Sequence, residues 1–404
     1  MMLKPDLIPV EEALSAMLQA IAPVTESEVI ALADALGRVL VEPAVAQVDV
    51  PPADNSAMDG YALNLQDLPA TLPISQRIPA GQSPLFLTPG TCARIFTGAE
   101  VPHGANCVVM QEKVVLTDDG EIAFPEDLGL ELGENIRPRG QDVRVGQQIV
   151  EAGQRLDYRH LGLLASVGVA QVRVYRQLTV AILCTGSELV QPGQPLQPGQ
   201  IYNSNRFLLK GFLQQRDVQV MDLGSVEDTL EATLEALKQA SAADLIISTG
   251  GVSVGEEDHI RPAIEILGEI SLWRLAIKPG KPLAFGQVQG TPFIGLPGNP
   301  VSTFVGLQLF VQPVLRKRAG ESGALQQSLL SGVAEFSAKT QIRQEYLRAK
   351  RTWRDGRWHL ETYPNQNSGV LTSAVWADSL VVMPPNTQVQ PGDEVSFFCY
   401  ALEG

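Results

Sequence analysis

The sequence has 404 residues, a formal net charge of −15 and an isoelectric point of about 4.8. A chain of this length predicts two to four domains, and its hydrophobic content of 45% with 19% charged residues is ordinary for a globular protein with several cores. Because the chain is acidic and carries no basic run, we do not expect nucleic acid as a partner.

The start of the chain lacks a basic segment followed by an apolar one, and no stretch approaches membrane-spanning length, so we expect a cytoplasmic protein with no membrane association. Cys92, Cys107, Cys184 and Cys399 are scattered without a Cys-x-x-Cys pair, which favours buried thiols over disulfides or a zinc site. The four histidines show no His-Glu-x-x-His spacing, so a histidine-based metal site is not expected.

Helical periodicity marks the first part of the chain. Apolar residues in 9–21 fall on one helical face, and 28–40 repeats the pattern. Asp157 is expected to cap a helix that ends near Gly168, and apolar alternation resumes at 169–174. We therefore predict one discontinuous helical and extended linker domain, formed by residues 1–45 and 139–176.

Between these two pieces the pattern changes to short apolar runs separated by proline and glycine, at 72–78, 92–96, 107–110 and 113–116. This spacing predicts a small inserted β domain over 46–138. Its first segment, 54–62, reads Asp-Asn-Ser-Ala-Met-Asp-Gly-Tyr-Ala, and Asp59-Gly60 within it could be only a turn. Thr97 stands at the end of the run 92–96.

Residues 177–325 alternate apolar strands with helical segments, which predicts a doubly wound α/β domain. After Gly320 the pattern becomes all β, and a C-terminal β-barrel or sandwich domain is expected over 326–404. The strands expected in these two domains are 178–184, 218–223, 245–247, 283–288, 292–296, 330–336, 345–352, 358–363, 379–383 and 394–400, with helices near 201–215, 226–240 and 300–318.

The segment 249–258, Thr-Gly-Gly-Val-Ser-Val-Gly-Glu-Glu-Asp, follows a buried strand and precedes a helical pattern that starts near Glu256. Two glycines at the carboxyl end of a strand let backbone N–H groups surround an anion, and ligands of open α/β sheets bind at this edge. An isolated Gly-Gly could equally be a tight turn. The anion-binding interpretation gains weight from three further loops.

Four loops of the α/β domain are expected to meet at the carboxyl edge of its sheet: 185–188, 225–228, 249–258 and 297–300. They supply Glu188, Asp228 and Asp258, hard oxygen ligands that suit Mg²⁺ beside phosphates. Lys278 and Lys281 flank a Pro-Gly pair, and beside an anion site they would hold a dianion. Pro297–Pro300 would form a rigid rim, or simply begin a helix.

The sequence resembles the MoeA family, the molybdopterin molybdenumtransferases related to the gephyrin E domain. The resemblance runs through the whole chain and rests on five motifs in order, at 54–62, 133–137 (Gly-Glu-Asn-Ile-Arg), 249–255, 278–282 (Lys-Pro-Gly-Lys-Pro) and 296–302 (Leu-Pro-Gly-Asn-Pro-Val-Ser).

The resemblance implies Mg²⁺-assisted insertion of molybdate into adenylylated molybdopterin, with release of AMP and molybdenum cofactor. It also implies a MogA-like central domain and a homodimer whose clefts are shared between subunits. It leaves open whether a separate adenylyltransferase docks on the protein, and whether molybdate is preferred over tungstate.

The family's site positions carry over to this chain as follows. Asp59, Thr97 and Asp142 match positions contributed across the dimer, and Glu188, Asp228 and Asp258 match acidic positions with a catalytic and metal-binding role. The substrate-binding positions are Thr185, Asn205, Gly250, Gly251, Ser253, Gly255, Lys278, Lys281, Pro297, Gly298, Asn299, Pro300, Arg348 and Ser373.

Two positions depart from the family pattern. Ser187 stands where the family has an aspartate, so no metal role is carried over to it, and Asn367-Ser368 replaces a Gly-Ser pair. Two other functions stay open on sequence grounds: a hydrolase of nucleotide pyrophosphates built on the same α/β domain, and a scaffold protein that binds a peptide.

Overall fold

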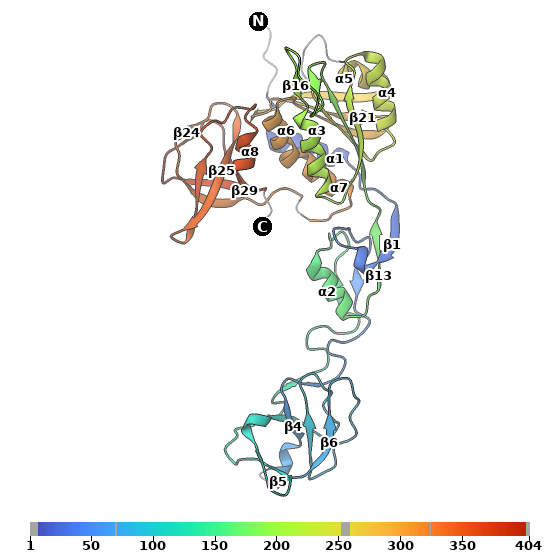
Figure 1. The fold of residues 1–404 in the computed structure, drawn as a ribbon, viewed down its shortest axis with the longest axis vertical. Coiled ribbons are helices and arrows are strands. Elements are labelled where there is room, and N and C mark those ends of the chain that lie inside the picture. Colours follow the sequence, from blue (N-terminus) through green and yellow to red (C-terminus); the bar gives the residue numbers. More distant parts are fainter. Residues whose placement is uncertain (1–6, 69–70, 252–258, 324, 401–404) are drawn as a thin grey trace.

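The computed structural model describes residues 7–68, 71–251, 259–323 and 325–400. The molecule is elongated (Figure 1): an α/β body and a β-barrel lie together at one end, and an arm leads away from them through a narrow linker to a second β domain. No helix in the described ranges is long and apolar enough to cross a membrane.

A six-stranded sheet forms the centre of the body, in the order β17-β14-β18-β22-β21-β19. The first four strands run parallel, and the last two pair antiparallel. β14 and β18 are almost fully buried, as expected of strands covered on both faces. The strands are β14 (Thr179–Thr185), β17 (Gln219–Val226), β18 (Leu245–Thr249), β19 (Gly268–Arg274), β21 (Pro282–Val288) and β22 (Thr291–Leu296).

Helices cover both faces of this sheet, which confirms the predicted doubly wound α/β fold. One apolar cluster joins one face of the sheet to α1, α3, α6, η4 and α7, and a second joins the other face to α4 and α5. The first group comprises α1 (Val10–Ala20), α3 (Ser204–Gln214), α6 (Pro300–Gly306), a π-helical turn η4 (Leu307–Val311) and α7 (Gln312–Arg318); the second comprises α4 (Leu230–Ala240) and α5 (Ile260–Leu267).

The linker differs from the sequence-based expectation. The helix predicted over 28–40 is wrong: Ser27–Ala31 is a strand, β1, paired antiparallel with β13 (Gln171–Tyr175), and a short 3-10 turn, η1 (Leu32–Asp34), follows. The β-branched pair Val29-Ile30 favours a strand, and its partner lies about 140 residues away in the sequence, where local periodicity cannot show it. The expected helix 9–21 exists as α1 but packs in the core of the body.

Elsewhere in the linker the prediction holds. Asp157 caps α2 (Tyr158–Ser166) by accepting hydrogen bonds from the backbone N–H groups of Arg159 and His160. Two short pairings carry the chain toward the arm, β2 (Ala44–Val45) with β12 (Gln148–Val150) and β3 (Asn55–Ser56) with β11 (Ile136–Arg137).

The β domain at the end of the arm contains a four-stranded sheet, β6-β7-β4-β8, and a three-stranded sheet, β5-β10-β9. One apolar cluster packs on the four-stranded sheet, and a second joins the two sheets. The strands of this domain are β4 (Gly60–Leu63), β5 (Thr71–Leu72), β6 (Ile74–Ile78), β7 (Cys92–Ile95), β8 (Cys107–Met110), β9 (Val115–Leu116) and β10 (Ile122–Ala123), with 3-10 turns η2 (Leu65–Asp67) and η3 (Gln111–Lys113).

The C-terminal domain is a closed barrel, which settles the choice between barrel and sandwich. The order β25-β26-β23-β29-β27 closes because β25 also pairs with β27. The strand β20 (Ile277–Lys278) leaves the body and pairs parallel with the start of β25, so the barrel is fixed beside Lys278. The barrel strands are β23 (Leu330–Ala334), β25 (Gln344–Arg354), β26 (Arg357–Thr362), β27 (Ser379–Met383) and β29 (Glu394–Cys399). The domain also contains α8 (Thr372–Trp376) and the paired strands β24 (Ala338–Lys339) and β28 (Gln388–Val389). In the body, β15 (Leu189–Val190) pairs with β16 (Ile201–Tyr202).

A buried carboxylate ties the linker to the body. Asp244 is 5% exposed and accepts two hydrogen bonds of 2.7 Å from the guanidinium of Arg176 and one of 2.9 Å from the backbone N–H of Thr179. Burial alone would raise the pKa of Asp244, but these hydrogen bonds outweigh it and lower the pKa below its ordinary value.

We predict that Asp244→Asn lowers the free energy of unfolding at pH 7 by about 1.5–3 kcal/mol, the range for hydrogen bonds to charged groups. Because the folded-state pKa is lowered, the contribution is complete above the unfolded pKa of about 3.9 and is lost as pH falls through the folded value. Urea unfolding at pH 7 and pH 3 measures the difference. Glu26→Gln is the control, since Glu26 contacts the same arginine at 3.6 Å but is 64% exposed, and it should change stability by less than about 1 kcal/mol. An equal penalty at both pH values would contradict the assignment.

Candidate functional site

A cleft of about 490 Å³ opens at the carboxyl edge of the parallel strands, where the body meets the barrel. Two of the four expected loops, those after β18 and β22, line it, and a third wall comes from the segment between β20 and β21. The barrel supplies the fourth wall. The lining residues are Gly250, Gly251, Lys278, Pro279, Gly280, Lys281, Pro282, Pro297, Gly298, Asn299, Ser302, Arg343, Gln366, Asn367 and Ser368.

Gly250 and Gly251 hold the loop after β18 in a conformation that other residues rarely adopt. Their φ angles are +84° and +66°. A Cβ on Gly250 would lie 2.6 Å from the carbonyl oxygen of Thr185, so the two loops approach each other too closely for a side chain. The turn therefore brings main chain, rather than side chains, to the floor of the cleft.

The positive charges of the cleft divide into two kinds. Lys278 Nζ lies 3.0 and 3.1 Å from the carboxylate oxygens of Glu345, a residue of β25, so its charge is compensated. Lys281 and Arg343 form no ion pair with any residue that the structure describes. The uncompensated cations of the cleft are therefore Lys281 and Arg343, in a chain whose net charge is −15.

Arg348 and Ser373 do not line the cleft but support its barrel wall. Arg348 is completely buried and donates hydrogen bonds to the hydroxyl of Ser373 at 3.0 Å and to the backbone carbonyl of Asn367 at 3.3 Å. The side-chain amide of Gln366 bonds the backbone of Arg348 in both directions. Burial lowers the pKa of Arg348 to about 10. This network fixes the loop 366–368 against the cleft.

The predicted substrate residues Thr185, Asn205 and Pro300 lie beneath the same edge. Asn205, on α3, donates a 2.7 Å hydrogen bond to the carbonyl oxygen of Gly298 and thereby holds the Pro297–Pro300 rim. The buried hydroxyl of Thr185 has no hydrogen-bond partner in the described structure. Pro300 begins α6, so the rim and the helix start coincide, as the sequence allowed.

The acidic residues predicted for the body are only partly placed. Glu188 and Asp228 follow β14 and β17 at the carboxyl edge, outside the cleft lining. Ser253, Gly255 and Asp258 lie outside the described residues. Among the residues that are described, no three His, Cys, Asp or Glu side chains gather as a metal site. Mg²⁺ is commonly held by one or two carboxylates together with substrate phosphates, and the exposed Glu188 and the partly buried Asp228 at this edge fit that mode.

Asp59 and Thr97 are brought together on the β domain of the arm. One carboxylate oxygen of Asp59 accepts hydrogen bonds from the backbone N–H of Thr97 at 2.8 Å and from its hydroxyl at 2.7 Å. The backbone hydrogen bond is the main reason that the pKa of Asp59 is lowered. Asp142 is exposed, on the segment that leads back from the arm. Figure 1 shows the arm directed away from the body, so these residues do not join the cleft of their own chain.

Sequence reasoning missed Arg343, Gln366 and Ser302 as parts of the site. Arg343 lies just before β25 in the barrel and reaches the cleft only because β20 pairs with that strand. Gln366 sits in a loop without regular structure, and Ser302 is buried in the first turn of α6. The one local signal was the Pro-Val-Ser end of the motif 296–302, which contains Ser302.

We predict that Gly250→Ala destabilises the protein by about 1–3 kcal/mol more than Gly290→Ala, the range for overpacking. Both glycines have nearly the same φ, +84° and +86°, so the conformational strain is matched. Only at position 250 would the added Cβ meet an atom, because Gly290 has open space around it. Equal unfolding free energies for the two variants, measured in urea, would show that the close approach to Thr185 is absent.

Comparisons with known proteins cover the chain from the linker to the barrel. Residues 8–168 match the MoeA N-terminal region (domain I and II), 181–317 a probable molybdopterin binding domain, and 334–399 the MoeA C-terminal region (domain IV). The two MoeA-specific matches lie on either side of the α/β body.

Named relatives and solved structures agree with these matches. A molybdopterin molybdenumtransferase of Haemophilus influenzae is 42% identical over 83% of this chain and 84% of its own, and one of Nostoc sp. is 39% identical over 73% and 70%. A molybdopterin biosynthesis MoeA protein from Pyrococcus horikoshii superposes with a TM-score of 0.79 at 29% identity, covering 98% of this chain and 99% of that one. A second structure of that description gives 0.82 at 27% identity, covering 98% and 100%. The chain therefore belongs to the MoeA family of molybdopterin molybdenumtransferases.

Proposed function

We propose that this protein is a cytoplasmic enzyme of molybdenum-cofactor biosynthesis that inserts molybdate into adenylylated molybdopterin and releases AMP and molybdenum cofactor. The observation that carries the proposal is the cleft itself, in which the backbone of Gly250 and Gly251 faces two uncompensated cations in an acidic chain. Membership of the MoeA family favours this reaction over hydrolysis of free nucleotide pyrophosphates. The domain division at 1–45 with 139–176, 46–138, 177–325 and 326–404 belongs to the same proposal.

The cleft suits two anions at once, as the reaction requires. The Gly-Gly turn offers main-chain N–H groups to a substrate phosphate. Lys281 and Arg343 attract a tetrahedral dianion, which is the form of the molybdate substrate. Lys278, held by Glu345, fixes the wall between these groups. Ser253, Gly255, Pro297, Gly298, Asn299 and Pro300 are proposed to complete the contacts to the substrate, with Arg348, Ser373, Thr185 and Asn205 holding the walls in place.

Glu188, Asp228 and Asp258 are proposed to bind Mg²⁺ at the carboxyl edge. When bound there, the ion would neutralise phosphate charge in the adenylylated substrate. The carboxylates would orient the phosphate end of the substrate. Their negative charge would repel a second anion from the carboxyl edge of the sheet. Ser187 leaves this set one carboxylate smaller than the family pattern.

Asp59, Thr97 and Asp142 are proposed to act in the cleft of a partner subunit. The arm carries them away from their own body, and a twofold partner would present its own arm to this cleft in the same way. We therefore propose a homodimer with two equivalent shared sites. The family resemblance leaves the docking of a separate adenylyltransferase open.

We predict that Lys281→Ala raises the molybdate concentration needed for half-maximal rate about tenfold or more while changing the rate at saturating molybdate by less than about threefold. An interaction that is equal in the ground and transition states affects KM without changing kcat. The assay measures molybdenum-cofactor formation from adenylylated molybdopterin at varied molybdate.

Lys238→Ala is the matched control, because Lys238 is an exposed lysine at the end of α4, away from the cleft. It should leave both constants unchanged. Arg343→Ala should resemble Lys281→Ala. An unchanged molybdate dependence in both cleft variants would exclude this pair as the molybdate site.

A further inference from the structure

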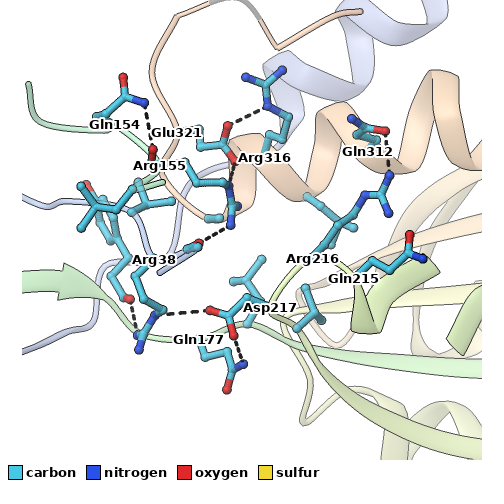
Figure 2. A pocket seen from close by; sticks show the side chains of 18 of the residues that line it. Arg38, Gln154, Arg155, Gln177, Gln215, Arg216, Asp217, Gln312, Arg316 and Glu321 are labelled. Atoms are coloured by element: carbon cyan, nitrogen blue, oxygen red, sulfur yellow. Dashed lines mark hydrogen bonds and ion pairs between the residues drawn. The ribbon is translucent and has the colours of Figure 1, made fainter. Parts of the chain in front are cut away.

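A second cavity, of about 700 Å³, lies where the linker meets the body. Figure 2 shows it from close by, with side chains from the linker on one side and from the ends of α3 and α7 on the other. We call it the elbow cavity and define it by Arg38, Arg155, Arg216, Gln308 and Gln312, which belong to its lining. It shares no lining residue with the cleft.

The carboxylates of the elbow cavity are already paired. Glu321 accepts hydrogen bonds from Arg155 at 2.6 Å and from Arg316 at 2.7 Å. Asp217 lies 3.6 Å from Arg38 and accepts a 2.6 Å hydrogen bond from the amide of Gln177. These pairs join linker to body, and they leave no free carboxylate among the labelled residues of Figure 2.

Arg216 is the exception among the arginines of this cavity. It is half-buried, and within the described structure it has no carboxylate partner. Its guanidinium stacks 3.5 Å from the centre of the Phe212 ring and donates to the carbonyl of Phe212 at 2.8 Å and to the amide oxygen of Gln312 at 3.1 Å. Two of its five N–H groups are thus used. Burial, together with repulsion from Arg155, lowers the pKa of Arg216 to about 10.

Gln308 adds a second unsatisfied group. It is only 5% exposed, lines the elbow cavity, and its side-chain oxygen has no hydrogen-bond partner. It lies in the π-helical turn η4, four residues before Gln312. It is therefore about one helical turn from the side chain that accepts a hydrogen bond from Arg216. A buried polar atom without a partner is costly, and π-helical turns are frequent at functional sites.

We propose that the elbow cavity binds the phosphate group of a small molecule, with Arg216 as its main contact and Gln308 as its second. Protonated phosphate offers a negative charge to Arg216 and a hydrogen-bond donor to the side-chain oxygen of Gln308. The planar guanidinium matches phosphate geometry with two parallel hydrogen bonds. The volume lies within the range of small-molecule sites, so the phosphate can be the free ion or part of a small ester.

A ligand in this position would lie at the joint between linker and body. Its two proposed contacts, Arg216 and Gln308, belong to the body, and Arg155 of the linker lines the same cavity. Because the binding site does not involve the cleft, it can be tested without turnover.

The experiment measures binding of radiolabelled inorganic phosphate by equilibrium dialysis, in full-length protein that carries Lys281→Ala and Arg343→Ala so that the cleft does not compete. We expect about one phosphate bound per chain. Adding Arg216→Gln should weaken that binding about tenfold or more, because a charged hydrogen-bond donor is lost. Adding Gln308→Leu should weaken it about threefold or more.

Arg261→Gln is the matched control, because it removes the same charge from the surface of α5. The Arg261 side chain is 56% exposed and pairs with Glu265. This variant should leave phosphate binding unchanged. No carboxylate among the described residues pairs with Arg216, so Arg216→Gln leaves none of them unpaired and should fold, which circular dichroism checks. No phosphate binding at millimolar concentration in the cleft variant, or binding unaffected by Arg216→Gln, would overturn the proposal.

Two further probes identify the source of the phosphate. Phenyl phosphate that binds more tightly than inorganic phosphate, with the same dependence on Arg216, would identify an ester as the ligand. Tighter binding of inorganic phosphate would identify the free ion. Arg216-dependent binding of benzoate without any binding of phosphate would overturn the phosphate assignment in favour of a carboxylate.

Discussion

The parallel pairing of β14, β18 and β22 is the constraint on which the cleft depends. Because these strands run in one direction, their carboxyl ends meet at one edge of the sheet, and the loops after β18 and β22 open into the same space. The approach of Gly250 to Thr185 shows how tightly those ends are packed. Loops that are distant in the sequence therefore lie side by side at the cleft.

A short strand pairing helps the barrel to complete this edge. Ile277 and Lys278 run parallel to Gln344 and Glu345, which brings Glu345 to the amino group of Lys278 and Arg343 to the cleft. Glu345 neutralises Lys278, whereas Lys281 and Arg343 leave two uncompensated positive charges in the cleft. An acidic protein can in this way bind an anion without a basic surface.

Much of this arrangement could be predicted from the sequence, for physical reasons that differ between elements. The buried apolar runs of β14 and β18 and the Gly-Gly turn are local signals. They predicted the sheet correctly, and the cleft lies at the edge where they placed the ligand. The helix predicted over 28–40 was wrong because part of this segment pairs with β13, which is remote in the sequence. The strand conformation depends on that pairing, and local periodicity cannot show it. Arg343 was missed for the same reason, since only the contact between body and barrel brings it to the cleft. The motifs 54–62 and 133–137 carried the family resemblance, yet nothing in their spacing places the arm relative to the body.

The central claim is that a single chain holds an incomplete site, which the arm of a second copy completes. Complementation tests this most directly: inactive Asp59→Asn protein is mixed with inactive Asp258→Ala protein, subunit exchange is confirmed by native mass spectrometry, and molybdenum-cofactor formation is measured. If each arm serves the partner's cleft, one cleft of a mixed dimer receives both substitutions and the other receives neither, so about half of the sites in mixed dimers should be active. If Asp59 serves the cleft of its own chain, every cleft keeps one defect, and confirmed exchange without recovered activity would contradict the account.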